Sequence, residues 1–151
     1  MTLNKGNSKY LIWHFLIKMN VYLQTVMNTF IISMGSNENR AENMSRCRYL
    51  LSEDYPDIVF SEMINTEPYG VTYHSDFYNQ LALINSEDSE FIVAEKLKRI
   101  ESEIGRRAGE KSQGIIKIDV DLLVVNGKII KSEDFERPYI NSLFDNLNKK
   151  G

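Results

Sequence analysis

The sequence has little cysteine and no excess of basic residues, and each scarcity excludes a class of protein. A single cysteine, Cys47, cannot form an internal disulfide, so the chain is not a scaffold held by its own disulfides. We interpret Cys47 as a small buried apolar side chain, compatible with a reducing cytoplasmic location. The net charge of -3 is not that of a dedicated nucleic-acid-binding protein, and no nucleic-acid partner is expected.

The chain also lacks a long hydrophobic run. The apolar stretch at residues 10–17 contains His14 and is followed by Lys18, whereas a membrane-spanning helix needs roughly 20 apolar residues. No small-residue cleavage site of a secretory signal follows it. We therefore expect no membrane association and treat residues 1–27 as a leader outside the fold. Translation from Met19 or Met27, or a loosely attached tail, would explain it; a helix for a lipid surface or a protein partner is the alternative.

The remaining sequence has the composition and order of one α+β domain. The whole chain of 151 residues is 42% apolar and 26% charged, as in globular proteins. Apolar periodicity and turn residues predict strands at residues 29–34, 58–65, 77–85, 115–125 and 128–130, and helices at 39–51 and 89–105. The order β-α-β-β-α-β-β predicts a ferredoxin-like sandwich, an antiparallel sheet with helices on one face. We place this domain at residues 28–140, followed by a polar C-terminal tail at 141–151.

Asp119 and Asp121 are the first candidate site. Side chains two apart on a strand point to the same face, so both carboxylates share one face of the predicted strand. Carboxylate oxygens suit Mg²⁺, which usually takes substrate phosphates as well. A solvated, negatively charged strand edge is the alternative, but the apolar neighbours Ile115, Ile116 and Leu122 argue against an exposed edge.

Further candidates lie at other element ends. The turn Gly35-Ser36-Asn37 allows close backbone approach to a ligand. Phe77 and Asn79 lie on one strand face, where a ring and an amide could hold a flat heterocycle, although core packing is the alternative for Phe77. Glu101 lies three residues after Lys98, and a surface pair between them is its alternative role. Arg106 suits a polyphosphate or simply the negative end of the helix dipole.

Taken together, five segments resemble the 6-hydroxymethyl-7,8-dihydropterin pyrophosphokinase family over residues 30–130. They are Gly35-Ser36-Asn37, Thr66-Glu67-Pro68-Tyr69-Gly70, Asp76-Phe77-Tyr78-Asn79, Arg99-Ile100-Glu101 with Gly105-Arg106, and Ile118-Asp119-Val120-Asp121. Each segment alone is unspecific, whereas five in the family's order are specific. The resemblance implies the ferredoxin-like fold and the transfer of pyrophosphate from ATP to a pterin in folate biosynthesis.

The resemblance also implies roles for individual residues. Asp119 and Asp121 would hold two Mg²⁺ ions that bridge the ATP phosphates, with Glu101 near the nucleotide and Arg106 near the phosphates. The pterin would be bound by Asn79, by Phe77 beside its ring, and by the backbone around Thr66, Pro68 and Tyr69. ATP and a pterin are thus the expected ligands, while the oligomeric state is left open.

The sequence departs from the family in three places, one of which is the glycine-to-aspartate loop, which is short and has lost arginine content. The usual Trp and Arg before the aspartate strand are replaced by Gln113-Gly114-Ile115-Ile116, and Lys117 is the candidate to replace the Arg in part. The family's Pro-His segment and distal aromatic correspond to Arg137-Pro138-Tyr139-Ile140, with Tyr139 as candidate for the His position and Phe144 for the aromatic.

These departures leave two alternatives to an active enzyme. One is a degenerate paralogue that binds nucleotide, pterin or a protein partner without turnover, and it predicts an open, uncovered cleft. The other is an assembly module, which predicts that the aspartates are splayed or paired with Lys117 or an arginine. Catalysis predicts that both aspartates face one cleft with Gly35, Phe77 and Asn79.

Overall fold

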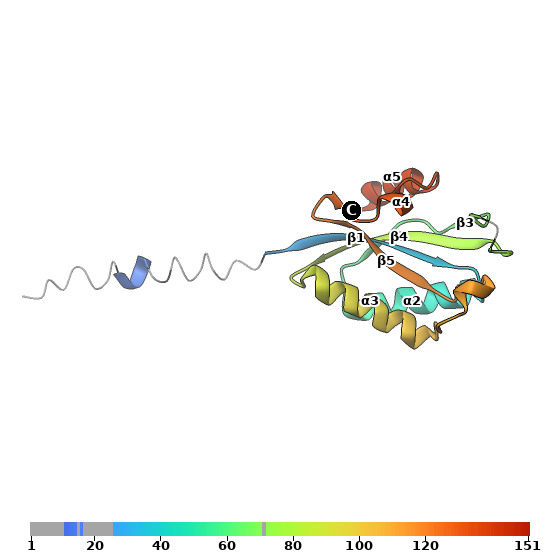
Figure 1. Ribbon diagram of the computed structural model, residues 1–151. Helices are drawn as coiled ribbons and strands as arrows, with labels where there is room; N and C mark the ends of the chain where they lie inside the picture. Colours follow the sequence, from blue (N-terminus) through green and yellow to red (C-terminus); the bar gives the residue numbers. More distant parts are fainter. Residues whose placement is uncertain (1–10, 15, 17–25, 71) are drawn as a thin grey trace, which may run out of the picture.

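A six-stranded antiparallel sheet forms the middle layer of the protein in the computed structural model, which describes residues 11–14, 16, 26–70 and 72–151 (Figure 1). The order of elements confirms the predicted α+β, ferredoxin-like architecture. The strands are β1 (Asn28–Ser36), β2 (Val59–Phe60), β3 (Ile64–Thr66), β4 (Phe77–Ser86), β5 (Asp119–Val125) and β6 (Lys128–Ile129). The helices are α2 (Arg40–Asp54), α3 (Glu90–Ile104), α4 (Ser132–Phe135) and α5 (Ile140–Lys150), with a short 3₁₀ turn at Lys111–Gln113.

Strand β1 lies at the centre of the sheet, between β4 and β5, in the order β2-β4-β1-β5-β6. Its register is continuous with β4, where Gly35 pairs with Asn79, and Gly35 also pairs with Asp119 of β5. The predicted strand at 58–65 is instead two short strands, β2 and β3, which both pair with β4. Between them the Ser61 hydroxyl accepts a hydrogen bond from the N–H of Leu81 at 2.9 Å, so a side-chain oxygen takes the place of a backbone carbonyl in the strand pairing.

Helices α2 and α3 cover one face of the sheet and enclose the larger core cluster (Figure 1). That core includes Cys47, which is fully buried, and burial raises the pKa of its thiol to about 12, as expected of an apolar, unreactive position. Ser89 caps α3 as predicted, its hydroxyl accepting the N–H of Ile92 at 3.3 Å. Gly105 ends the helix with a φ of 102°.

Helices α4 and α5 cover the opposite face of the sheet (Figure 1). The prediction that the helices lie on one face only is therefore wrong. Residues 140–150 form α5, where a polar tail is predicted from residue 141. Ile140, Leu143 and Leu147 recur at helical spacing and are buried against Leu81 and Leu123. Three apolar residues form this narrow stripe, and the polar residues between them make the segment look like a tail in the sequence.

Most of the predicted leader lies outside the described residues. Within the part of the chain that the structure describes, no helix has the length and apolar character needed to cross a bilayer. Asn126-Gly127 forms the predicted hairpin, with φ values of 48° and 79° at its two turn residues. This turn leads from β5 into β6 and then into α4.

The packing of α5 can be tested by truncating its central side chain. Leu143 is fully buried, so replacing it with Ala should lower the free energy of unfolding by about 2–5 kcal/mol. The matched control is Asn148→Ala on the exposed side of α5, expected to change it by less than about 0.5 kcal/mol. Denaturant titration gives both values, and equal stabilities of the two variants would show that α5 does not belong to the core.

Candidate active site

A cleft of about 970 Å³ is lined by residues of the sheet, of the segment around α4 and α5, and of α3. Its floor is formed by β1, β4 and β5, and its roof by residues 130–139, which we call the cover segment. The predicted residues that line it come from five separate parts of the chain: Gly35, Thr66, Tyr69, Phe77, Asn79, Glu101, Arg106, Asp119 and Asp121. The cleft therefore unites the candidates for metal, nucleotide and pterin binding.

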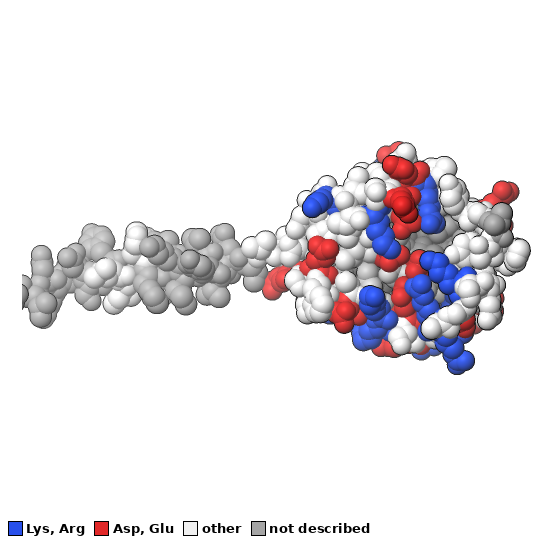
Figure 2. All heavy atoms as spheres, viewed as in Figure 1, with Lys and Arg blue, Asp and Glu red and all other residues white. Residues whose placement is uncertain are grey.

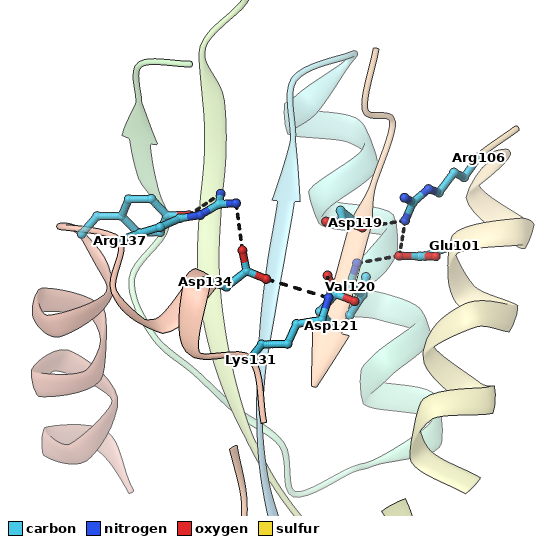
Figure 3. Close-up of polar contacts among 9 residues, drawn as sticks. Glu101, Arg106, Asp119, Val120, Asp121, Lys131, Asp134 and Arg137 are labelled. Atoms are coloured by element: carbon cyan, nitrogen blue, oxygen red, sulfur yellow. Dashed lines mark hydrogen bonds and ion pairs between the residues drawn. The ribbon is translucent and has the colours of Figure 1, made fainter. Parts of the chain in front are cut away.

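Asp119 and Asp121 share this face of β5, as predicted, while Val120 and Leu122 point into the core beneath α2 and α3. Each carboxylate has a cationic partner (Figure 3). Arg106 Nη1 lies 2.6 Å from Asp119 Oδ1, and Lys131 Nζ lies 2.9 Å from Asp121 Oδ2. These contacts engage one oxygen of each carboxylate.

Asp121 lies partly buried beside a second carboxylate on the same strand face, and its pKa shows both effects. Burial raises the pKa of its carboxyl, and the neighbouring Asp119 charge raises it further. The attraction of Lys131 opposes both effects without cancelling them, while Asp121 in turn raises the pKa of the Lys131 ammonium against the effect of burial. The ionised pair is therefore held at a cost to stability that a bound cation would reduce.

Glu101 fixes Arg106 beside the aspartates. Its Oε1 accepts a bond from Arg106 Nη1 at 2.6 Å and from the backbone N–H of Val120 at 2.8 Å (Figure 3). Strand β6 pairs with β5 at Val124 and Val125, so Val120 lies beyond that pairing and takes a side-chain acceptor instead. This contact replaces the surface pair with Lys98 that the sequence also allowed. Burial raises the pKa of Glu101, and the bond to Val120 opposes that shift.

The other end of the cleft is built around Asn79. Its Nδ2 donates to Thr66 Oγ1 at 2.6 Å, and its Oδ1 lies 3.5 Å from the Tyr139 hydroxyl. A Cβ on Gly35 would lie 2.9 Å from Asn79 Oδ1, so glycine in β1 leaves the room that this amide occupies. Phe77 packs edge-on to Tyr73, with ring centroids 5.2 Å apart, and both rings line the cleft.

Ser36 and Asn37 do not face the cleft, in contrast to the ligand contacts that the turn suggests. The Ser36 hydroxyl donates to the Lys117 carbonyl at 2.6 Å. The Asn37 amide donates to the Gly114 carbonyl at 2.8 Å and accepts the Ile116 N–H at 2.7 Å. Their short polar groups hold residues 114–117, which lead into β5, so this turn positions the aspartates indirectly.

Two known relatives of the sequence, a protein family and a single enzyme, indicate the family of this chain. The model of the 7,8-dihydro-6-hydroxymethylpterin-pyrophosphokinase family matches residues 31–148. The 2-amino-4-hydroxy-6-hydroxymethyldihydropteridine pyrophosphokinase of Haemophilus influenzae is 29% identical over 120 residues, which cover 75% of this chain and 72% of the relative. The chain belongs to the pterin pyrophosphokinase family. The family match reaches residue 148 and so includes most of α5.

Three residues predicted to act in this site are not among the residues that line the cleft. Lys117 Nζ pairs with Glu110 Oε1 at 2.8 Å and donates to the Gly105 carbonyl at 3.2 Å, outside the cleft lining. Pro68 lies in the loop between the lining residues Thr66 and Tyr69 without lining the cleft itself. Phe144 packs on Phe135, with centroids 5.3 Å apart, in the core beneath α5.

Conversely, the cover segment brings in three charged residues for which no role in the site was predicted from the sequence. Lys131, Asp134 and Arg137 line the cleft, together with Tyr139, the candidate for the family's His position. Arg137 Nη2 pairs with Asp134 Oδ1 at 2.8 Å, and its Nη1 donates to the Tyr139 hydroxyl at 3.4 Å. Burial raises the pKa of that hydroxyl, and Arg137 opposes the shift. In the sequence these three charged residues recur at every third position, and this spacing could have indicated that they lie close together.

The donor set at the aspartates suits a hard divalent cation completed by other oxygens. No group of three or more His, Cys, Asp or Glu side chains that could hold a metal occurs among the described residues. Asp119 and Asp121 alone provide hard oxygen donors side by side, and Mg²⁺ commonly binds through one or two carboxylates plus phosphate and water. The residues present therefore fit Mg²⁺ bound together with a polyphosphate.

The three interpretations of the sequence make different claims about this site. The aspartates face one cleft with Gly35, Phe77 and Asn79, as catalysis predicts, and residues of the cover segment line that cleft, which a degenerate paralogue was expected to leave uncovered. Asp119 does pair with an arginine, as an assembly module would predict, but its side chain stays 42% exposed in the cleft. On the face seen in Figure 2, acidic and basic side chains are interspersed, without the broad basic surface of a nucleic-acid-binding protein.

The raised pKa of Asp121 predicts a stability effect with a definite sign. Because the folded-state pKa lies above the unfolded value, ionised Asp121 lowers stability at neutral pH. Asp121→Asn should therefore raise the free energy of unfolding at pH 7. The gain should shrink as the pH falls through the raised pKa and vanish below about 3.9, where the wild-type carboxyl is protonated in both states.

Chemical denaturation across this pH range tests the effect, with the exposed Asp145→Asn on α5 as control. A stability loss in Asp121→Asn at pH 7 would contradict the expected sign.

Proposed function

We propose that the protein transfers pyrophosphate from ATP to the hydroxymethyl group of 6-hydroxymethyl-7,8-dihydropterin, a step of folate biosynthesis. The new bond joins the hydroxymethyl oxygen to the β-phosphorus, the bond between the β-phosphorus and the oxygen bridging to the α-phosphate breaks, and AMP and the hydroxyl proton leave. One observation carries the proposal: the carboxylate pair and the amide-and-aromatic pocket around Asn79 open into the same cleft. Family membership supports the same conclusion.

The polyphosphate would lie at the β5 end of the cleft. Asp119 and Asp121 are the residues that would hold Mg²⁺, which when bound would neutralise phosphate charge and make the hydroxymethyl group a better nucleophile. Arg106 presents a planar guanidinium that matches phosphate oxygens in a bidentate manner. Glu101 holds Arg106 in place, so the guanidinium needs little reorganisation to meet the phosphates.

The nucleoside would extend from there along α3. The cleft lining also includes the apolar residues Ala94, Leu122 and Ile130, as well as Lys98. Apolar walls with a few polar groups are what a heterocycle and its sugar require. In this proposal the triphosphate would lie between the nucleoside and the aspartates.

The pterin would bind at the β4 end. A pterin edge carries both N–H donors and ring acceptors, which is the complement of a carboxamide such as Asn79. Thr66 and Tyr139 orient that amide through their hydroxyls. Phe77 and Tyr73 offer aromatic surface for the bicyclic ring.

In this mechanism the protein acts chiefly by positioning. Asn79 and Asp119 both pair with Gly35 in adjacent strands, so the two substrates would meet over one row of the sheet. Holding two reactants in a fixed orientation replaces an encounter in solution by a reaction within one complex. The residues of the sheet supply that orientation, and Arg106 and Lys131 supply positive charge near the transferred group.

Formation of AMP tests the reaction directly. Purified protein with magnesium, ATP and 6-hydroxymethyl-dihydropterin should release AMP only when the pterin is present. Asp119→Asn should lower kcat by at least about 100-fold, because it removes a metal-binding charge at the transferred phosphate. Asp145→Asn on exposed α5 is the control and should match the wild type. A folded protein that binds both ligands without forming AMP would instead be the non-catalytic paralogue.

The assignment of the pterin end predicts a separation of kinetic constants. Asn79→Ala should raise KM for the pterin roughly 10–100-fold, the loss expected from one or two buried hydrogen bonds, while KM for ATP stays within about twofold. Asn85→Ala, at the exposed end of the same strand, should change neither constant. Steady-state kinetics with each substrate varied in turn distinguishes the cases, and a selective rise of KM for ATP would place the pterin elsewhere.

A further inference from the structure

We infer that Lys131 is a phosphate-binding residue. Its ammonium pairs with the Asp121 carboxylate before the nucleotide binds, and it then leaves that carboxylate to bind a phosphate oxygen. The inference rests on the proposed function, because it requires a metal-bound polyphosphate as ligand. It concerns a residue of the cover segment.

Lys131 bridges the floor and the roof of the cleft. Its ammonium lies 2.9 Å from Asp121 Oδ2, on β5, and 3.8 Å from Asp134 Oδ2, on α4 (Figure 3). Asp134 has an independent partner in Arg137, at 2.8 Å, so it stays fixed to the cover segment whether or not Lys131 contacts it. The close contact of Lys131 is therefore with Asp121, the carboxylate that would hold the metal.

The two cations facing the aspartates are held differently. Arg106 Nη1 is shared between Asp119 and Glu101 at 2.6 Å each, so it keeps a close carboxylate partner if Asp119 turns to a metal. Lys131 has one close partner, and its side chain is 44% exposed. An exposed, unbranched side chain can rotate without unpacking the core. Lys131 is thus the cation whose contact a metal would replace most directly.

The charges around Lys131 are balanced both before and after the nucleotide binds. Without nucleotide, Lys131 offsets the repulsion between Asp119 and Asp121. A metal at Asp121 takes over that task, and the phosphates bring negative charge to the same place. Lys131 then finds a phosphate oxygen within the cleft that it already lines. Asp134 keeps the ammonium nearby during the exchange.

The exchange predicts opposite effects on two ligands. Lys131→Met keeps the length of the side chain and removes its charge. Because a competing cation is lost, the variant should bind Mn²⁺ alone at least about threefold more tightly. Because a charged phosphate contact is lost, it should bind ATP in the presence of Mg²⁺ about 10-fold more weakly. Electron paramagnetic resonance of free Mn²⁺ and calorimetry with ATP and Mg²⁺ measure the two affinities.

Two further variants separate the inference from general effects of charge. Lys131→Arg keeps the cation and should lie within about threefold of the wild type in both assays. Lys128→Met removes a charge from exposed β6, outside the cleft lining, and should also leave both affinities nearly unchanged. Thermal unfolding of each variant checks that it is folded.

The outcomes are distinct. Opposite changes in Lys131→Met alone support the exchange. Equal behaviour of Lys131→Met and Lys128→Met would overturn it, and so would a parallel loss of both affinities, which indicates a purely structural ion pair. If the wild-type protein binds Mn²⁺ but no ATP, the proposed function fails and the exchange fails with it.

Discussion

The register of the central strand β1 is the constraint on which the rest of the structure depends. Gly35 pairs with Asn79 on one side and with Asp119 on the other, so residues far apart in the chain lie in one row across the sheet. A slip by one residue would turn every side chain of a strand to the opposite face and separate the amide from the carboxylate. The long pairing of β1 with β4, from Asn28 to Ser36, and its apolar core face fix that register.

Stability and function make opposing demands on this row. Two carboxylates on neighbouring positions of one strand face repel each other, and burial of Asp121 adds to the cost. The fold offsets that cost with Arg106 from the end of α3 and Lys131 from the cover segment. Both cations come from outside the sheet; under the proposed function Arg106 would meet the phosphates where Glu101 holds it, and Lys131 would turn toward them, while the carboxylates stay in place. The cations that offset this repulsion in the free protein are the ones that the proposed function assigns to the phosphates.

Several features could be predicted from the sequence because they depend on local rules. Alternation along a strand placed Asp119 and Asp121 on one face, and an Asn-Gly pair predicted the hairpin that follows. Other predictions failed where a partner distant in sequence decides the role. Phe144 packs on Phe135, and the side chains of Ser36 and Asn37 bond residues 114–117, although their local sequence suited a ligand.

The sequence by itself determined the α+β order, the family and the shared face of the two aspartates, because periodicity, turns and motif order are properties of neighbouring residues. Only the tertiary structure decided what surrounds that pair. The apolar stripe of α5 is too narrow to be recognised in the sequence. Its role is evident in the fold, where it packs against Leu81 and Leu123. Its docking holds the cover segment over the sheet and brings Lys131 to Asp121, a contact between elements that no local pattern specifies.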